Sequence, residues 1–560
     1  MPSSQTGTIN PINPPPAAIM IPRLSTDNFQ NGSMRQLPAH HFIFPTSPFC
    51  TRRASLIYQR GAQHSPFALL SSSSTPTPFS FPCIKQDNYQ SRFNSLYCPI
   101  DPVHRSMDQV SYLPPSKLLL TGCLVLICLF LAIYWIAPSW FGVPPITLVA
   151  PRNPGKAGEG NINQFIEEHV ASLRNGFKPS WWLPNGHAQT IYSAMADFSK
   201  DDQLTYQRHL LRLPDGGTIG VDIYPPLSVS LPARSPVVIL NHGLTGGSHE
   251  SYVRNMVHHI ARPYHLGGLG GRVAVVNFRG CADTPITSPH LYSSGTTLDT
   301  HTATLYLSHL FPEAPFFGIG FSLGAAVMTR YLGEQGLESR LRAACVLCAP
   351  LELRQMTAKL DARQLFPKLY SYSMARKMLR SLLPHLLLPD TPLSSPESPL
   401  HPHLPALLSM AGRYRFTLRA SHVMEVVAAK VGGSSEHFPF AGLTQFLEWA
   451  CPGAWLGKIR RPILAISAID DPIVSGECLP FETVQASSHF VLAAVPHGGH
   501  LGWFDGPVSG PDKHRRWHVK PVLEFLRAAV DLPWTPLPAV RVSEVEGWTW
   551  AGNIGWKVIG

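Results

Sequence analysis

A serine stands between two glycines at the point where an apolar run changes into a helical pattern. Residues 315–319 predict a short buried strand, and residues 325–332 predict a helix. Between them lies the segment Gly320-Phe321-Ser322-Leu323-Gly324. A tight strand-to-helix turn pushes its central side chain outward, and glycines two positions away leave room for the strand and the helix. This context favours a nucleophilic Ser322 over an ordinary serine in a turn.

Acidic residues follow a later strand. A serine nucleophile needs a base, and the base needs an acid that orients it. Residues 463–468 predict a buried strand, and Asp470 and Asp471 come after it, at the carboxyl end where open α/β sheets place their sites. Asp471 abuts residues 472–474, which start the next loop, so we favour it as the orienting carboxylate. Asp470 is left as a neighbouring or loop-capping acid.

Histidines follow the last predicted strand, residues 490–495. His500 comes after two glycines, which give its loop the freedom to bring an imidazole to the serine. His497 lies nearer the strand and is expected to be a solvated loop residue. The order serine, acid, histidine is that of the α/β-hydrolases. The sequence therefore predicts a catalytic triad of Ser322, Asp471 and His500.

The negative charge that develops during attack on a carbonyl needs backbone N–H donors. One donor is expected from Leu323, which follows the nucleophile. The second is expected from the loop after the predicted strand 236–240, where Leu244 is favoured and Thr245 is the alternative. His242 in this loop is expected to brace the backbone rather than to take part in catalysis.

Strand patterns alternate with helical segments, which predicts a largely parallel sheet covered by helices on both faces. We place one catalytic α/β domain at residues 150–532, with a helical cap inserted at about 352–450. Apolar residues of the cap are expected to form core or lid packing rather than an acyl tunnel: Phe366, Leu369, Tyr370, Met374, Met378 and Leu382. The predicted strands lie near Leu210 and at 236–240, 272–278, 316–321, 343–347, 463–468 and 490–495, and the predicted helices include 251–261, 298–310 and 518–530.

Several segments share their order with one known family. They are Trp182–Thr190, Asn241–Ser248 with Ser251-Tyr252, Asn277–Cys281, Gly320–Gly324, Asp470–Pro472 and Gly498–Gly502. Together they resemble the AB hydrolase superfamily 4, whose members are membrane-anchored α/β-hydrolase-domain lipases and esterases. These include bacterial YheT-like hydrolases, fungal monoacylglycerol lipases and medium-chain fatty-acid ethyl ester synthase/esterases. The resemblance covers roughly residues 150–530, and the chain departs from compact members at 383–408 and in the tail, 533–560.

The resemblance implies the α/β-hydrolase fold and the same triad. It also implies cleavage of carboxylic esters of medium- or long-chain fatty acids, such as monoacylglycerols or ethyl esters, through an acyl-enzyme on Ser322. An alcohol that replaces water would yield a new ester, so an acyl-CoA:alcohol O-acyltransferase that makes fatty-acid ethyl esters is the alternative. A catalytically silent membrane scaffold is a further alternative, which the intact motifs disfavour. We expect neither a cofactor nor a metal ion.

Residues 118–137 are uncharged and apolar, and about twenty such residues suffice to cross a bilayer as a helix. Trp135 and Trp140 suit one membrane interface, and Lys117 lies at the other end. We therefore predict a single transmembrane span, with an endoplasmic reticulum or lipid-droplet-associated membrane favoured and a mitochondrial membrane as the alternative. Arg105 and Lys117 precede the span, so the positive-inside tendency places the catalytic domain in the lumen.

Residues 1–106 are rich in Ser, Pro, Asn and Gln and are predicted to be disordered. Their scattered arginines also fit a mitochondrial-type presequence. Met107 is followed shortly by a complete predicted anchor and catalytic domain. We therefore add the hypothesis that the first hundred residues arise from an upstream start.

The chain has 560 residues and a net charge of +10, and its basic groups are dispersed rather than interleaved with aromatic residues. This pattern argues against nucleic acid as a partner and fits either a solvated face or attraction to anionic lipid headgroups. The expected partners are a membrane bilayer and the lipid ester substrate that the family resemblance implies. The 25 histidines form no set with metal-ligand spacing. Cys345 and Cys348 have a C-x-x-C spacing but lie in an apolar strand pattern, which favours core packing.

Overall fold

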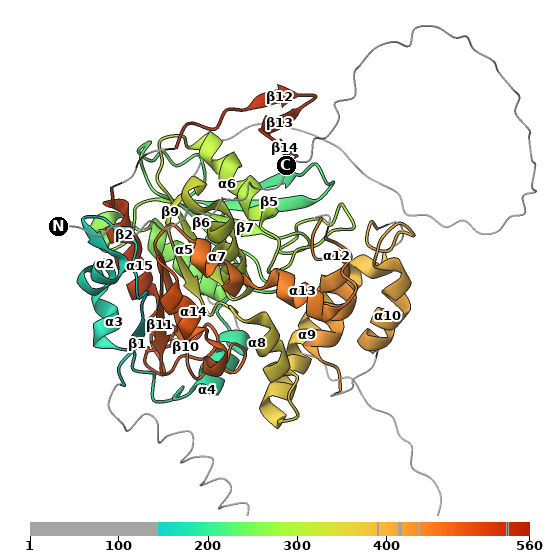
Figure 1. The fold of residues 1–560 in the computed structure, drawn as a ribbon, viewed down its shortest axis with the longest axis horizontal. Helices are drawn as coiled ribbons and strands as arrows, with labels where there is room; N and C mark the ends of the chain where they lie inside the picture. The colour runs from blue at the N-terminus through green and yellow to red at the C-terminus, as the bar shows by residue number, and fades with distance from the viewer. Residues whose placement is uncertain are drawn as a thin grey trace, which may run out of the picture. The chain divides into compact units, whose positions relative to one another are not determined.

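The computed structural model describes residues 144–388, 391–412, 417–434, 437–533, 535 and 537–559 (Figure 1). The predicted membrane span, the N-terminal tail and the Met107 start lie outside these residues. Across the ranges that the structure describes, no helix combines the length and the apolar character that a membrane crossing needs.

A mixed sheet of 12 strands forms the centre of the domain, and its neighbouring strands from β11 to β7 run parallel. The order across the sheet is β1-β11-β10-β9-β8-β6-β7-β5-β4-β14-β13-β12. The strands are β1 (Thr147–Val149), β4 (Gln207–Arg212), β5 (Thr218–Tyr224), β6 (Val237–Asn241), β7 (Arg272–Asn277), β8 (Phe316–Phe321), β9 (Leu341–Leu347), β10 (Ile463–Ala468), β11 (Phe490–Val495), β12 (Ser543–Val545), β13 (Trp548–Ala551) and β14 (Ile554–Val558). A separate hairpin joins β2 (Lys156–Ala157) to β3 (Gly160–Asn161).

Both faces of the sheet are buried, which explains why the parallel strands have nearly continuous apolar sequences. In β6, Val237 and Ile239 belong to the hydrophobic core on one face, and Val238 and Leu240 belong to the core on the other. Helices α6 (Leu298–Leu310) and α7 (Leu323–Gln335) contribute to the first core. Helices α2 (Ile162–His169), α5 (Ser251–Ala261) and α15 (Val519–Val530) contribute to the second. The predicted α/β-hydrolase arrangement, with a mostly parallel sheet and helices on both faces, is confirmed.

The segment between β9 and β10 is helical, as the sequence predicts, and it has a small core of its own. Figure 1 shows its helices α9, α10, α12 and α13 grouped at the side of the sheet domain. Its helices are α8 (Leu353–Leu360), α9 (Leu365–Leu387), α10 (Leu404–Gly412), α11 (Ala420–Val423), the π-helix η5 (Met424–Ala428), α12 (Ala429–Val431) and α13 (Leu443–Ala450). The remaining α-helices are α3 (Ala171–Asn175), α4 (Gly186–Met195) and α14 (Phe481–Ala486).

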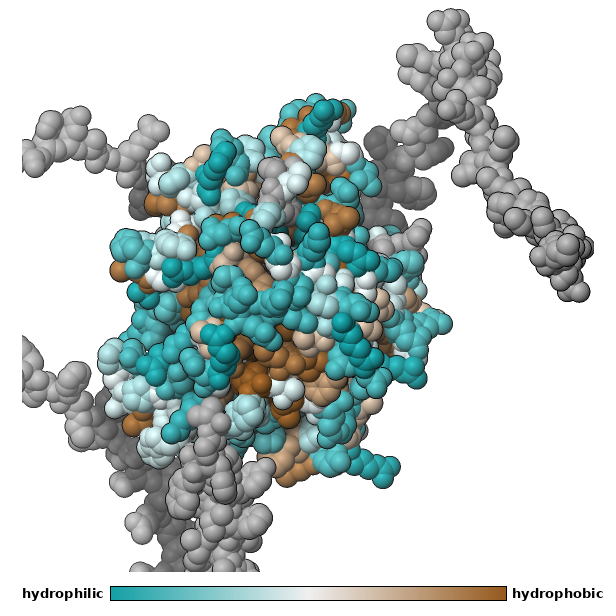
Figure 2. Space-filling view, turned by 60° about the vertical axis from the view of Figure 1, so that its left-hand side comes forward, coloured by the Kyte–Doolittle hydropathy of each residue, from teal (hydrophilic) through white to brown (hydrophobic). Residues whose placement is uncertain are grey.

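The C-terminal residues that the sequence analysis set aside as a tail form three strands of the sheet. Strand β14 pairs with β4, with Lys557 opposite Arg212. Trp556 on β14 is 1% exposed and packs with Tyr306 of α6 at a ring-centroid distance of 6.2 Å. The outer surface is mixed: most of the face in Figure 2 is hydrophilic, and its hydrophobic residues gather in the lower half.

Candidate active site

Ser322 lies in the turn between β8 and α7 with φ +51° and ψ −116°, a strained backbone conformation for a residue with a side chain. The flanking glycines make this turn possible. A Cβ on Gly324 would lie 2.3 Å from the carbonyl oxygen of Asn241, and one on Gly320 would lie 2.5 Å from Cα of Ala325. The backbone N–H of Ser322 donates to the carbonyl of Leu347 at 2.8 Å, which ties the turn to β9.

The structure brings the three predicted triad residues into one hydrogen-bonded chain. His500 Nε2 lies 2.8 Å from Ser322 Oγ, and His500 Nδ1 lies 2.8 Å from Asp471 Oδ2. Since the carboxylate can only accept, Nδ1 carries the proton and Nε2 faces the serine as a base. This geometry is that of a Ser-His-Asp triad, in which the histidine activates the serine as a nucleophile.

Asp471 is 3% exposed and is fixed through its second oxygen. Oδ1 accepts the backbone N–H groups of Ile473 at 2.7 Å and Val474 at 2.9 Å. Burial by itself raises the pKa of this carboxyl, but the contacts with His500 and with these N–H groups outweigh it and hold the pKa of Asp471 below its ordinary value. The carboxylate therefore stays ionised beside the imidazole.

Asp470 has a different set of contacts. Its Oδ1 accepts the N–H of Gly499 at 2.9 Å, and its Oδ2 lies 3.1 Å from Nδ1 of His497. Asp470 and His497 thus pair with each other and hold the loop that carries His500. His497 is a bound loop residue rather than the solvated one that the sequence suggested.

Side chains of helix α4 hydrogen-bond to the loop that carries His500, a role that sequence reasoning missed. Thr190 Oγ1 accepts the backbone N–H of His500 at 2.8 Å. Gln189 Oε1 accepts the N–H of Phe504 at 2.7 Å, and its Nε2 donates to the carbonyl of the same residue at 3.1 Å. Both side chains belong to the segment Trp182–Thr190, whose family resemblance was the signal that pointed here. The two residues that they hold, His500 and Phe504, are more than 300 positions away, so spacing alone could not reveal the contacts.

Two tyrosine hydroxyls bracket the loop after β6. Tyr252 accepts the N–H of Gly243 at 3.0 Å, and Tyr292 accepts the N–H of Thr245 at 3.0 Å. The backbone N–H of Thr245, the alternative oxyanion donor, is therefore already hydrogen-bonded to a side chain. Within the described part of the chain, the N–H groups of Leu244 and Leu323 have no hydrogen-bond partner. Both residues line the cavity beside Ser322, which is where oxyanion donors are needed.

His242 braces this loop from the protein interior. The ring is fully buried, and burial lowers its pKa to about 4, so it is neutral at pH 7. Nδ1 donates to the carbonyl of Gly243 at 2.7 Å, and Nε2 accepts the N–H of Phe278 at 3.2 Å. The structural role expected from the sequence matches these contacts.

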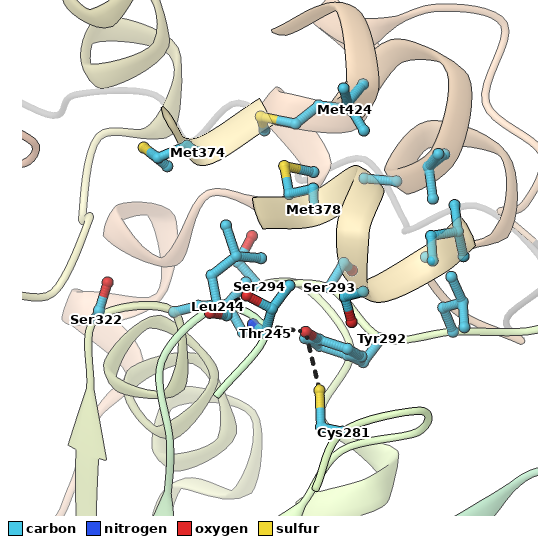
Figure 3. A pocket seen from close by; sticks show the side chains of 18 of the residues that line it. Leu244, Thr245, Cys281, Tyr292, Ser293, Ser294, Ser322, Met374, Met378 and Met424 are labelled. Atoms are coloured by element: carbon cyan, nitrogen blue, oxygen red, sulfur yellow. Dashed lines mark hydrogen bonds between the residues drawn. The ribbon is translucent and has the colours of Figure 1, made fainter. Parts of the chain in front are cut away.

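An apolar cavity of about 140 Å³ opens beside Ser322. Figure 3 shows Ser322 at one end of it, with Leu244, Thr245 and Tyr292 along one side and Met374, Met378 and Met424 along the other. Met374, Met378 and Leu382 of the cap line this cavity, a role that the sequence analysis ranked below core or lid packing, and Leu382 also belongs to the small core of the cap. Their helical spacing could not reveal it, because the same spacing serves a core face and a cavity wall.

Within the described ranges, Cys348, Asp471 and His500 form a group whose donor atoms all lie within 4.8 Å of one another. Two of these residues are already joined by the hydrogen bond of the triad. Cys348 is fully buried behind Asp471, and burial raises the pKa of its thiol well above the ordinary value. Cys348 is a neutral neighbour of the carboxylate, and Cys345 is buried in β9, as expected for core packing.

Comparison with known proteins decides the family. Residues 236–507 match the family described as alpha/beta hydrolase fold. The Picea glauca protein named embryogenesis-associated protein EMB8 is 30% identical over 368 residues, which cover 64% of this chain and 73% of that protein. The chain belongs to the α/β hydrolase fold family.

This α/β hydrolase is also similar to two proteins of Saccharomyces cerevisiae. One is named monoacylglycerol lipase and is 28% identical over 407 residues, which cover 66% of this chain and 84% of the yeast protein. The other is named medium-chain fatty acid ethyl ester synthase/esterase 2 and is 25% identical over 421 residues, which cover 65% and 89%. The predicted family resemblance is confirmed at the level of an α/β hydrolase of lipase and esterase type.

Proposed function

We propose that this α/β hydrolase cleaves carboxylic esters of medium- or long-chain fatty acids, such as monoacylglycerols or fatty-acid ethyl esters. The observation that carries the proposal is the hydrogen-bonded chain of Ser322, His500 and Asp471, with two distances of 2.8 Å, at the end of an apolar cavity. The names of the yeast relatives support the class of substrate.

The proposed reaction uses the five residues predicted from the sequence. Ser322 Oγ attacks the ester carbonyl while His500 Nε2 takes its proton, and Asp471 stabilises the imidazolium. The N–H groups of Leu244 and Leu323 bind the oxyanion. The alcohol leaves with a proton from His500, and an acyl-enzyme remains on the serine. Water, activated by the same histidine, then releases the fatty acid.

The cavity supports an acyl chain of limited length. Its volume of about 140 Å³ is comparable with the roughly 150 Å³ of an apolar cavity that binds benzene. Met374, Met378 and Met424 in its walls have flexible, polarisable side chains that adapt to longer chains. An alcohol that enters in place of water would make a new ester. The synthase/esterase name of one yeast relative keeps this acyl transfer as the second candidate.

A panel of acyl esters of increasing chain length, assayed with and without ethanol, tests the proposal. We expect the highest kcat/KM with medium-length chains, and free acid as the main product when ethanol is absent. New ethyl ester in proportion to the ethanol supplied would establish the transfer reaction. No turnover of any ester by protein that a fluorophosphonate still labels would contradict the proposed substrate class.

Replacing Tyr292 with phenylalanine tests the oxyanion loop. The N–H of Thr245 would lose its acceptor, and the loop that aims Leu244 would shift. Loss of a whole oxyanion donor costs about 10²–10³ in kcat, so we expect a fall of about tenfold for a displaced one. KM should hold because the aromatic ring remains in place. A trifluoromethyl ketone forms a hemiketal with the serine, and its former carbonyl oxygen then occupies the oxyanion site, so its affinity should fall by the same factor.

Tyr306→Phe is the matched control. Like Tyr292, Tyr306 has a hydrogen-bonded hydroxyl; it is 4% exposed and its hydroxyl contacts Nδ1 of His209 at 2.5 Å, away from the site. We expect this variant to keep the wild-type kcat. Equal losses in the two variants would show that Tyr292 acts only on stability.

We also propose that the protein is anchored in a membrane by the predicted span 118–137, with an endoplasmic reticulum or lipid-droplet-associated membrane favoured. A lipid ester substrate partitions into such a membrane, which supports the placement. Extraction of the native protein by alkaline carbonate, without detergent, would contradict an integral span.

A further inference from the structure

A group of exposed apolar side chains lies beside the site, on α4 and on the first two turns of α9. Five residues form this interfacial patch: Ile191, Met195, Leu365, Phe366 and Leu369. Met195 is 80% exposed, Leu365 73% and Phe366 52%. Isolated exposed apolar residues are common, but a continuous group marks a surface that contacts something.

Contacts between the two helices make the patch continuous. His187 precedes Ile191 by one turn on α4, and its ring packs on Phe366 of α9 at a centroid distance of 4.6 Å. Nδ1 of His187 also lies 2.9 Å from the hydroxyl of Tyr370. The exposed face of α4 and the start of α9 thus meet at His187.

The patch leads to the cavity. Further along α9, Met374, Met378 and Leu382 line the wall of the cavity beside Ser322. One helix therefore carries apolar residues first to the surface and then to the place proposed for the acyl chain. Such a continuous apolar surface suits a lipid that moves from a bilayer to the serine.

Basic side chains flank the exposed residues of α9, while Asp361 precedes them and Asp197 follows Met195 of α4. Arg363 and Lys368 flank the exposed residues of α9, and residues 362–369 contain no acidic residue. Helix α4 carries no Asp, Glu, Lys or Arg. Apolar side chains flanked by cations insert at the boundary between headgroups and acyl chains, and each cation there is attracted to anionic lipid.

The direction of β1 places the start of the described chain at the carboxyl ends of the parallel strands, where the loop of His500 lies. Strand β1 runs antiparallel to β11, with Thr147 opposite Ala494 and Val149 opposite Leu492. The chain therefore enters the sheet at the end where β11 stops, and the loop that follows β11 carries His500. Only six residues, 138–143, separate the predicted span from Pro144, and they reach roughly 20 Å when extended. The proposed anchor would therefore keep this end of the strands near the bilayer.

We propose that the interfacial patch docks on a phospholipid bilayer and that the ester passes from the bilayer along α9 to Ser322. This inference rests on the proposed lipid-ester activity and on the proposed anchor. It adds which surface of the catalytic domain meets the membrane and where the substrate enters.

The test uses the full chain reconstituted in vesicles of phosphatidylcholine with a minor fraction of phosphatidylserine. The variant Leu365→Ser/Phe366→Ser should hydrolyse an ester embedded in the vesicle about tenfold more slowly, because the patch loses its apolar contact with the acyl region. Hydrolysis of a soluble short-chain ester should stay within twofold of wild type. The matched control is Leu337→Ser, since Leu337 is 65% exposed and follows α7, which starts at Leu323, next to Ser322, and runs away from the site. Equal losses on both esters, or no loss on either, would overturn the docking proposal.

A second measurement does not depend on activity. Phospholipids with brominated acyl chains should quench the added fluorescence of Phe366→Trp more strongly than that of Leu337→Trp. Equal quenching of the two variants would overturn the proposal, and it is the result expected if a second copy of the chain covers the patch. If the wild-type protein cleaves neither ester, the proposed function fails, while the quenching result still decides the docking.

Discussion

Ester hydrolysis is expected to disappear when Ser322 is replaced by alanine. The hydroxyl is the proposed nucleophile, and His500 Nε2, 2.8 Å away, then has no proton to accept. Removal of a triad nucleophile costs on the order of 10⁶ in kcat, which lies below the detection limit of most esterase assays. Labelling by a fluorophosphonate probe should be lost at the same time, because the probe phosphonylates the same oxygen.

Ser294→Ala is the control for this change. Ser294 lines the same cavity and is labelled in Figure 3, but it lies outside the hydrogen-bonded chain of the triad. We expect both labelling and hydrolysis to persist in this variant. Equal labelling of Ser322→Ala and wild-type protein would defeat the serine mechanism. A wild-type protein that takes no label would instead favour the silent scaffold.

Exchanging each of the two adjacent acids for asparagine should separate their roles. Asp471→Asn offers an amide where His500 Nδ1–H needs a carboxylate, so the imidazole would hold the wrong tautomer and lose the charge that stabilises its protonated form. The corresponding change in a serine protease lowers kcat by about 10⁴. We expect a loss of that order with little change in KM.

Asp470→Asn should have a much smaller effect. An asparagine at this position keeps a carbonyl oxygen for the N–H of Gly499 and loses only the charge beside His497. We expect kcat to fall by less than about tenfold, because His500 stays positioned by Asp471 and by Thr190. Steady-state kinetics of both variants decide the matter, and a larger loss in Asp470→Asn would reverse the assignment.

Part of the fold could be predicted from the sequence, because fully buried parallel strands have continuous apolar runs. The predicted strand 463–468 coincides with β10, and 490–495 coincides with β11. Strand β5 was not predicted, because it carries a buried Asp222. That carboxylate is compensated by its ion pair with Arg208 of β4 at 2.7 Å and by hydrogen bonds from Asn277 and Ser248. The strands of the C-terminal tail were missed for a different reason: β14 gains its burial from β4 and α6, which are distant in the sequence, while β12 is exposed and β13 is half-buried.

The sequence by itself indicated the class of chemistry proposed for this protein. The turn around Ser322 and the acid and histidine that follow later strands are local patterns, and local backbone geometry constrains them strongly. Only the tertiary structure decided between neighbours. Asp471, and not Asp470, reaches His500. The N–H of Thr245 donates a hydrogen bond to the hydroxyl of Tyr292, while the N–H of Leu244 has no partner among the described residues. These choices depend on contacts between distant segments, such as Thr190 with His500 across 310 positions, and on which way each side chain leaves its turn.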